Sequence, residues 1–145
     1  MRACQYLCAM KKSSAKIEMD HATVECVSPD LIELRFKPSI TLTSAGLGEV
    51  IRAKEQLCVR PMDVLAIFPP DLDLELNVLS IDHRAMNNGC GLSRRLAIAA
   101  QDTFTSRLAE IYFRYHPRDG ETAVFLKEAE ARDWLASMAP APSLS

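Results

Sequence analysis

The sequence lacks the features that mark several large classes of protein. No apolar run approaches the ~18 residues that a membrane-spanning helix needs, so we expect no integral membrane segment. There are 17 lysines and arginines against 19 aspartates and glutamates, and this net charge of −2 argues against broad binding to nucleic acid or anionic membranes. The chain has no P-loop and no G-x-G-x-x-G, G-x-S-x-G or H-E-x-x-H motif. We therefore expect a non-catalytic protein without a cofactor.

The cysteines give no sign of a disulfide framework or a zinc site. They are odd in number, scattered, and make no C-x-x-C pair: Cys4, Cys8, Cys26, Cys58 and Cys90. This pattern predicts free thiols in a reducing cytoplasm. A nucleophilic Cys90 in its glycine-flanked loop is the alternative, but nothing in the sequence supplies the base that would activate it, so an inert thiol is favoured.

The length of 145 residues predicts one domain. We expect residues 1–18 to be a flexible N-terminal extension, residues 19–139 to form the domain, and residues 140–145 to be a loose C-terminal tail.

Apolar periodicity predicts the first half of the fold. Ala22–Val27 and Leu31–Lys37 alternate apolar and polar residues on either side of a turn, which predicts an antiparallel hairpin. A helix is predicted from candidate caps within Thr41–Ser44 to about Cys58. Val64–Phe68 is apolar throughout, as a central strand covered on both faces should be.

The second half supplies two β–α units within Leu92–Leu135. Leu96–Ala100 and Thr122–Leu126 are short apolar runs, and apolar residues at helical spacing follow each of them. Strands that alternate with helices through short connections are parallel. With a short helix beginning at Ser80 or Asp82, the prediction is an α/β fold: a mixed β-sheet with an N-terminal antiparallel hairpin on a parallel core, and about four helices.

Three segments have a recognisable order and spacing: Ser80–Ala85, the run from Leu96 to Leu108 with its Thr105-Ser106-Arg107 helix start, and Val124-Phe125 followed by an E-A-E-A-x-x-W-L helix. Together they resemble the SpoIIAA-like proteins, small bacterial domains with a STAS-like fold. The resemblance covers roughly residues 20–138. It implies a STAS-like sheet and a regulatory or protein-binding role in the bacterial cytoplasm.

One departure concerns phosphorylation. Regulatory STAS domains carry a phosphorylatable serine in an Asp-Ser-Ser-Gly-type turn after the central strand, whereas this chain has Pro69-Pro70-Asp71-Leu72 there. Only Ser80 lies near the second helix. We therefore expect no phosphoserine switch at this turn.

The strongest candidate site lies where a predicted parallel strand ends and a helix begins. Ligands bind at the carboxyl ends of strands in open α/β sheets, and helix N-termini attract anions. The candidate ligand- or partner-binding residues are Asp102, Thr103, Thr105, Ser106 and Arg107. Plain capping of the helix with a solvated arginine is the simpler alternative.

Two functions remain open. The leading interpretation is a non-catalytic STAS-like module that binds a protein partner or itself, as a homodimer. The alternative is a carrier of a lipid or another small apolar ligand, in a pocket lined by Leu72, Leu74, Leu76, Leu79, Tyr112 and Tyr115. The aromatic helix that follows Asp102 would then be a pocket wall or a subunit interface, although packing against the sheet is the commoner role. The acidic Asp71, Asp73 and Glu75 lack the pattern of a calcium loop, so we expect a solvated face and no metal site.

Overall fold

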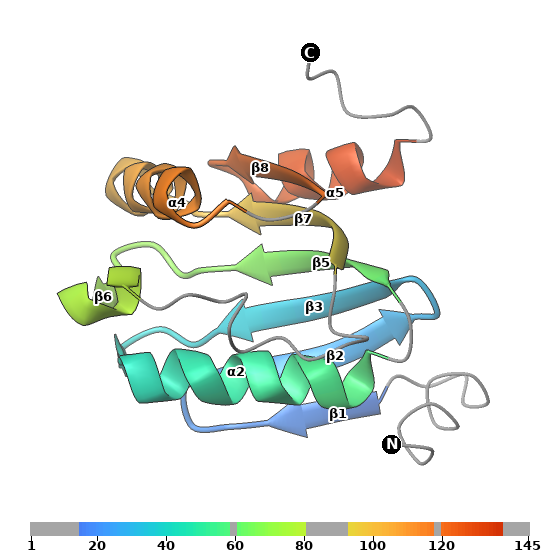
Figure 1. Cartoon of the computed structure of the whole chain (residues 1–145), viewed down its shortest axis with the longest axis horizontal. Helices are drawn as coiled ribbons and strands as arrows, with labels where there is room; N and C mark the ends of the chain where they lie inside the picture. The colour runs from blue at the N-terminus through green and yellow to red at the C-terminus, as the bar shows by residue number, and fades with distance from the viewer. Residues whose placement is uncertain (1–14, 59–60, 81–92, 118–119, 138–145) are drawn as a thin grey trace.

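A six-stranded sheet in the order β1-β2-β3-β5-β7-β8 forms the centre of the molecule (Figure 1). The computed structural model describes residues 15–58, 61–80, 93–117 and 120–137. The sheet strands are β1 (Ala15–Glu18), β2 (Ala22–Ser28), β3 (Leu31–Phe36), β5 (Met62–Ile67), β7 (Ser93–Ala99) and β8 (Glu121–Phe125). The helices are α2 (Ser44–Leu57), α4 (Thr103–Tyr115), α5 (Glu128–Ala136) and the 3-10 helix η1 (Leu76–Ser80). A separate parallel pair joins β4 (Thr41–Leu42) to β6 (Asp73–Leu74).

The first three strands are antiparallel. The predicted hairpin is confirmed as β2 and β3, which pair with Val24 opposite Leu34. Alternation buries Val24 and Leu34 on the core side, because successive side chains of a strand point to opposite faces. The predicted boundary at residue 18 is wrong, since Ala15–Glu18 adds a third antiparallel strand at the edge, with Ile17 opposite Val24.

The remaining strands are parallel, as predicted. β3 pairs with β5, β5 with β7 and β7 with β8, so the two central apolar runs are adjacent. All six residues of β5 are buried because both faces of the sheet are covered. Val64 and Ala66 pack in the cluster that contains Val50 and Leu57 of α2. Leu65 and Ile67 pack in the cluster that contains Ala131 of α5.

Two of the helices, α2 and α4, begin at capping residues that the sequence offers. Thr43 caps α2, and its Oγ1 accepts a hydrogen bond from the backbone N–H of Gly46 at 3.0 Å. Asp102 caps α4 in the same manner. The described residues contain three α-helices, against about four predicted. The predicted helix after Ser80 lies outside the described residues, apart from Ser80, which ends η1.

The burial of α4 differs from the prediction. Packing on the sheet was the commoner role expected for this helix, with a pocket wall or a subunit interface as alternatives. Phe104, Ile111 and Tyr115 are exposed, and Thr105 is the buried residue of the helix. Ala109 and Phe113 pack against the core from the α2 side of the sheet. The helix therefore rests on a different face from the one that hydrophobicity alone indicates.

Two further sequence predictions are tested by the described residues. Cys26 is disulfide-bonded, and its partner is not among the described residues, so the prediction of five free thiols is wrong for Cys26. Cys58 is a buried free thiol. No helix in the described part of the chain is long and apolar enough to cross a membrane.

Candidate functional site

Asp102 joins two loops at the carboxyl edge of the sheet. One carboxylate oxygen accepts a hydrogen bond from the backbone N–H of Thr105 at 2.7 Å, which caps α4. The other accepts a hydrogen bond from the backbone N–H of Asp71 at 2.7 Å, and this bond links the start of α4 to the loop that follows β5. The Thr105 hydroxyl also donates to this second oxygen, at 3.3 Å. Both oxygens of Asp102 are thus used within the protein.

These hydrogen bonds determine the ionisation of Asp102. Burial opposes the charged form, but the bonds from the backbone of Thr105 and Asp71 and from the Thr105 hydroxyl favour it. The pKa of Asp102 therefore lies below its ordinary value. Its carboxylate already occupies the helix N-terminus, where an external anion would have to compete with it.

The other predicted site residues do not converge on one point. Thr105 is buried beside Asp102, and Ser106 is half-buried. Thr103 and Arg107 are exposed. The structure thus brings Asp102 and Thr105 together as a cap and leaves Arg107 outside it, which fits the simpler alternative for this segment.

The loops at this edge have a defined backbone conformation. Asp71 and Gln101 have positive φ values of 60° and 68°. The Gln101 side-chain amide donates to the backbone carbonyl of Phe68, and the Phe68 ring stacks on Phe36 with centroids 4.5 Å apart. The left-handed conformation is costly for non-glycine residues. The hydrogen bond from Asp71 to Asp102 and the one from Gln101 to Phe68 compensate for this cost and hold both loops in place.

The six residues predicted to line an apolar pocket have different environments. Leu72 is buried, and Leu74, Leu79 and Tyr112 are half-buried. Leu76 and Tyr115 are 74% and 75% exposed, so these two are surface residues. η1 and α4 do lie side by side, since Nε2 of His116 is 3.0 Å from the backbone carbonyl of Leu79. The Tyr112 ring packs on His116 with centroids 4.7 Å apart.

A shallow, open hollow of about 550 Å³ lies between α4 and β8. Its lining is of mixed polarity: Glu110, Phe113, Arg114, Pro117, Gly120, Thr122 and Val124. None of the six predicted pocket residues belongs to it.

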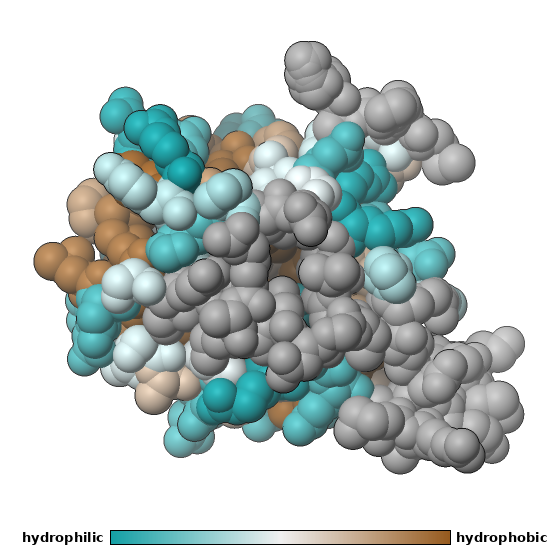
Figure 2. Space-filling model, viewed as in Figure 1, coloured by the Kyte–Doolittle hydropathy of each residue, from teal (hydrophilic) through white to brown (hydrophobic). Residues whose placement is uncertain are grey.

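Exposed apolar side chains instead gather on the outer side of α4 and η1. Phe104 is 64% exposed and Ile111 is 39% exposed, and with Tyr115 and Leu76 they form what we call the α4–η1 surface. Figure 2 shows apolar surface on the side where Figure 1 places α4 and β6. Sequence reasoning did not assign Phe104 and Ile111 to a site, because their helical spacing does not distinguish a core face from a partner surface.

The described residues contain no group of three or more histidine, cysteine, aspartate or glutamate side chains that could hold a metal ion. Asp71, Asp73 and Glu75 are exposed, as expected for a solvated acidic segment.

Comparison with known proteins gives one structural likeness. No family model and no curated protein match the chain. A crystal structure of an uncharacterized protein from the DUF3478 family with a SpoIIAA-like fold, from Shewanella loihica PV-4, aligns with 84% of this chain and 91% of its own. The identity is 15% and the TM-score is 0.44. The mixed sheet is established by the strand order and pairing of this chain itself.

Proposed function

We propose that this protein is a non-catalytic, regulatory binding module that holds a protein partner on the α4–η1 surface. The observation that carries the proposal is the joint exposure of Leu76, Phe104, Ile111 and Tyr115. Adjacent exposed apolar side chains are typical of interaction sites, and aromatic residues are enriched at interfaces. The resemblance to small bacterial domains suggests a bacterial cytoplasmic location, although the disulfide of Cys26 counts against a reducing compartment.

The non-catalytic part of the proposal is supported by the polar groups at the carboxyl ends of the strands, which form hydrogen bonds within the protein. The two oxygens of Asp102 accept hydrogen bonds from Thr105 and Asp71, and the Gln101 amide donates to Phe68. A catalytic acid or base must instead reach a substrate proton. These groups fix the loops beside the α4–η1 surface.

A carrier of a lipid or another apolar ligand remains the alternative, but it has less support. An apolar ligand needs an enclosed, mainly apolar pocket, whereas Leu76 and Tyr115 are exposed and the hollow beside α4 includes Glu110 and Arg114. Native mass spectrometry of gently purified protein separates the two functions. A co-purifying apolar mass supports the carrier, and its absence supports the module.

Site-specific photocrosslinking tests the proposed surface directly. A photoreactive phenylalanine analogue replaces Phe104 in one variant and Val27 in a matched control. Val27 is also exposed, but it lies at the end of β2, beside the amino end of β3. It is therefore at the opposite end of the strands from Phe104. We expect a discrete protein adduct from position 104 and none from position 27. Equal adducts from both positions, or none from either, would contradict the proposal.

A further inference from the structure

Carboxylates lie on the η1 side of the α4–η1 surface. Asp71, Asp73 and Glu75 are exposed on and beside β6, immediately before η1. Asp73 accepts a hydrogen bond from the Thr41 hydroxyl at 2.7 Å. None of the three carboxylates forms an ion pair with a residue in the described ranges.

Arginines lie on the other side. Arg107 and Arg114 are exposed on α4, and within the described part of the chain neither forms an ion pair. They are seven residues apart, which is close to two turns of an α-helix, so both project from nearly the same side. Glu110 is also exposed, but helical geometry places it further from the apolar stripe than either arginine.

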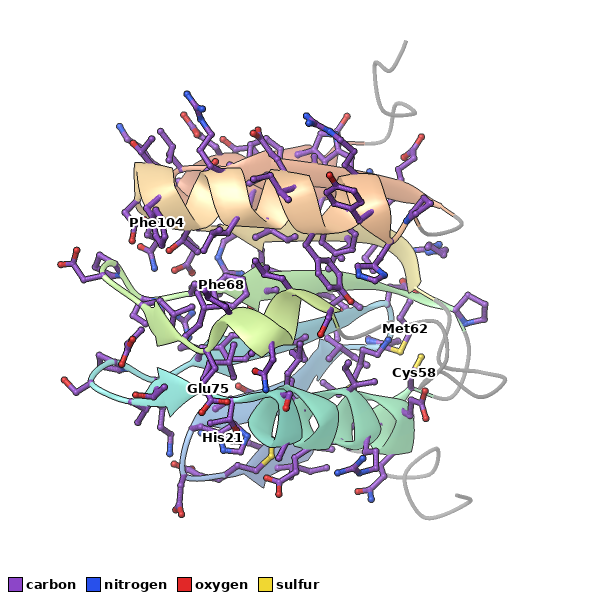
Figure 3. All side chains as sticks on the ribbon, turned by 60° about the vertical axis from the view of Figure 1, so that its left-hand side comes forward. His21, Cys58, Met62, Phe68, Glu75 and Phe104 are labelled. Carbon is purple, nitrogen blue, oxygen red and sulfur yellow. The ribbon has the colours of Figure 1, made fainter. Side chains whose placement is uncertain are left out.

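The order of these features around α4 follows from its contact with η1. His116 faces η1 through the carbonyl of Leu79, and Tyr112 packs beside it. At about 100° per residue, rotation away from that side reaches Phe104, Ile111 and Tyr115, and then the arginines. Figure 3 places Glu75, beside η1, and Phe104, at the start of α4, on opposite sides of Phe68. The surface therefore runs from acidic through apolar to basic.

A surface with this order is complementary to itself. We infer that the partner on the α4–η1 surface is a second copy of this chain, related by a twofold axis through the apolar stripe. In a twofold interface each copy presents the same patch, and residue i meets residue j twice. Rotation places Arg107 and Arg114 of each copy against Asp73 and Glu75 of the other, while the apolar side chains meet at the centre. The inference rests on the proposed function and specifies its partner.

Charge reversal with mixing tests this pairing. The first variant carries Arg107→Glu with Arg114→Glu, and the second carries Asp73→Lys with Glu75→Lys. Each variant alone brings like charges together at both contacts, so its self-association should weaken at least ~10-fold relative to the wild type. An equal mixture of the two restores opposite charges at both contacts and should form a heterodimer. Sedimentation velocity of each sample measures these states, and far-UV circular dichroism confirms that both variants are folded.

The matched control is Arg52→Glu with Glu49→Lys on α2, where both side chains are exposed. It should self-associate like the wild type. The inference is overturned if the wild type is monomeric at all attainable concentrations, or if the mixture does not restore association. The photocrosslinking experiment keeps the two proposals distinct. An adduct at position 104 with a different protein supports the binding module and overturns the second copy, whereas the absence of any adduct overturns the binding module itself.

Discussion

Arg95 on β7 and Asp63 on β5 form an ion pair in which Nη2 lies 2.9 Å from the carboxylate oxygen Oδ2. Asp63 is only 5% exposed, so its charge needs a partner. The same guanidinium donates to the backbone carbonyls of Leu135 at 2.7 Å and Trp134 at 3.3 Å, and it lies 5.5 Å from the centre of the Trp134 ring. One arginine thus ties the C-terminal end of α5 to the sheet.

We expect Arg95→Ala to lower the free energy of unfolding by about 1.5–3 kcal/mol, because the buried carboxylate of Asp63 loses its closer hydrogen-bonded partner and keeps only Arg94. Arg94→Ala is the matched control, because Arg94 also approaches Asp63, at 3.4 Å, but is half-exposed. It should cost less than about 1 kcal/mol. Urea denaturation measures both values, and equal losses for the two variants would show that Arg95 has no special role.

The central strands provide a second test of stability. Ile67 and Ile98 are almost fully buried, in clusters on opposite faces of the sheet. Each substitution to alanine should cost about 2–5 kcal/mol through lost transfer energy and a residual cavity. Leu76→Ala, at an exposed position, should change stability by less than about 0.5 kcal/mol. A loss below about 1 kcal/mol at both isoleucines would contradict their placement in the core.

Local signals in the sequence predicted much of this fold. β5 and β7 were predictable because a strand covered on both faces is apolar without alternation. The starts of α2 and α4 were predictable because Thr43 and Asp102 are typical capping residues. β1 was missed because a four-residue edge strand is stabilised by its pairing with β2, which the sequence of Ala15–Glu18 does not reveal.

The candidate surface was harder to predict than the fold. Helical periodicity identified the apolar stripe that contains Phe104 and Ile111, but it cannot tell whether such a stripe faces the core or a partner. Thr105, Ala109 and Phe113 took the inner face because Asp102 fixes the start and orientation of α4. Asp102 and Asp71 are 31 positions apart in the sequence, and Arg95 and Asp63 are 32 positions apart. No local sequence pattern therefore indicates these two contacts.

An ion-pair network between β3 and α5 gives a third prediction. Arg132 binds Glu33 and Glu128, each at 2.7 Å, and Arg35 binds Glu128 at 3.2 Å. The hydrogen bond from Arg35 holds the pKa of Glu128 below its ordinary value, and Arg132 contributes, although burial opposes both. Because these groups are partly exposed, Arg132→Ala should cost only about 0.2–1 kcal/mol.

The dependence of stability on salt concentration distinguishes this ion-pair network from the buried pair of Arg95 and Asp63. At about 1 M salt the screening length falls to roughly 3 Å, so the cost of Arg132→Ala should shrink, whereas the cost of Arg95→Ala should persist. Urea titrations at low and high sodium chloride concentration measure both differences, with Arg52→Ala as an exposed control. A cost of Arg132→Ala that is unchanged by salt would show that packing, and not charge, is lost.

A fourth prediction concerns the two hydrogen-bonding roles of Asp102. An asparagine has one acceptor oxygen, so Asp102→Asn can keep the bond from Thr105 or the bond from Asp71, but not both. We expect the cap to persist, because asparagine caps helices about as well as aspartate. The link to Asp71 should then break, because the amide N–H₂ would face the backbone N–H of Asp71 and cannot accept from it. Hydrogen exchange at the Asp71 amide should therefore accelerate in Asp102→Asn, while exchange at the Thr105 amide changes less. Asp102→Ala should lose both and cost about 0.5–2 kcal/mol.

The same substitution predicts a dependence on pH. The pKa of Asp102 is lower in the folded protein than in the unfolded chain, so folding favours the ionised form. The resulting stabilisation is fully present above the unfolded value of about 4 and is lost as the pH falls through the folded pKa. The stability difference between wild type and Asp102→Asn should therefore be constant near neutral pH and decrease in acid. Urea denaturation across the acidic range measures it. A difference that stays constant down to the acid unfolding of the protein would show that the carboxylate acts through its shape and not its charge.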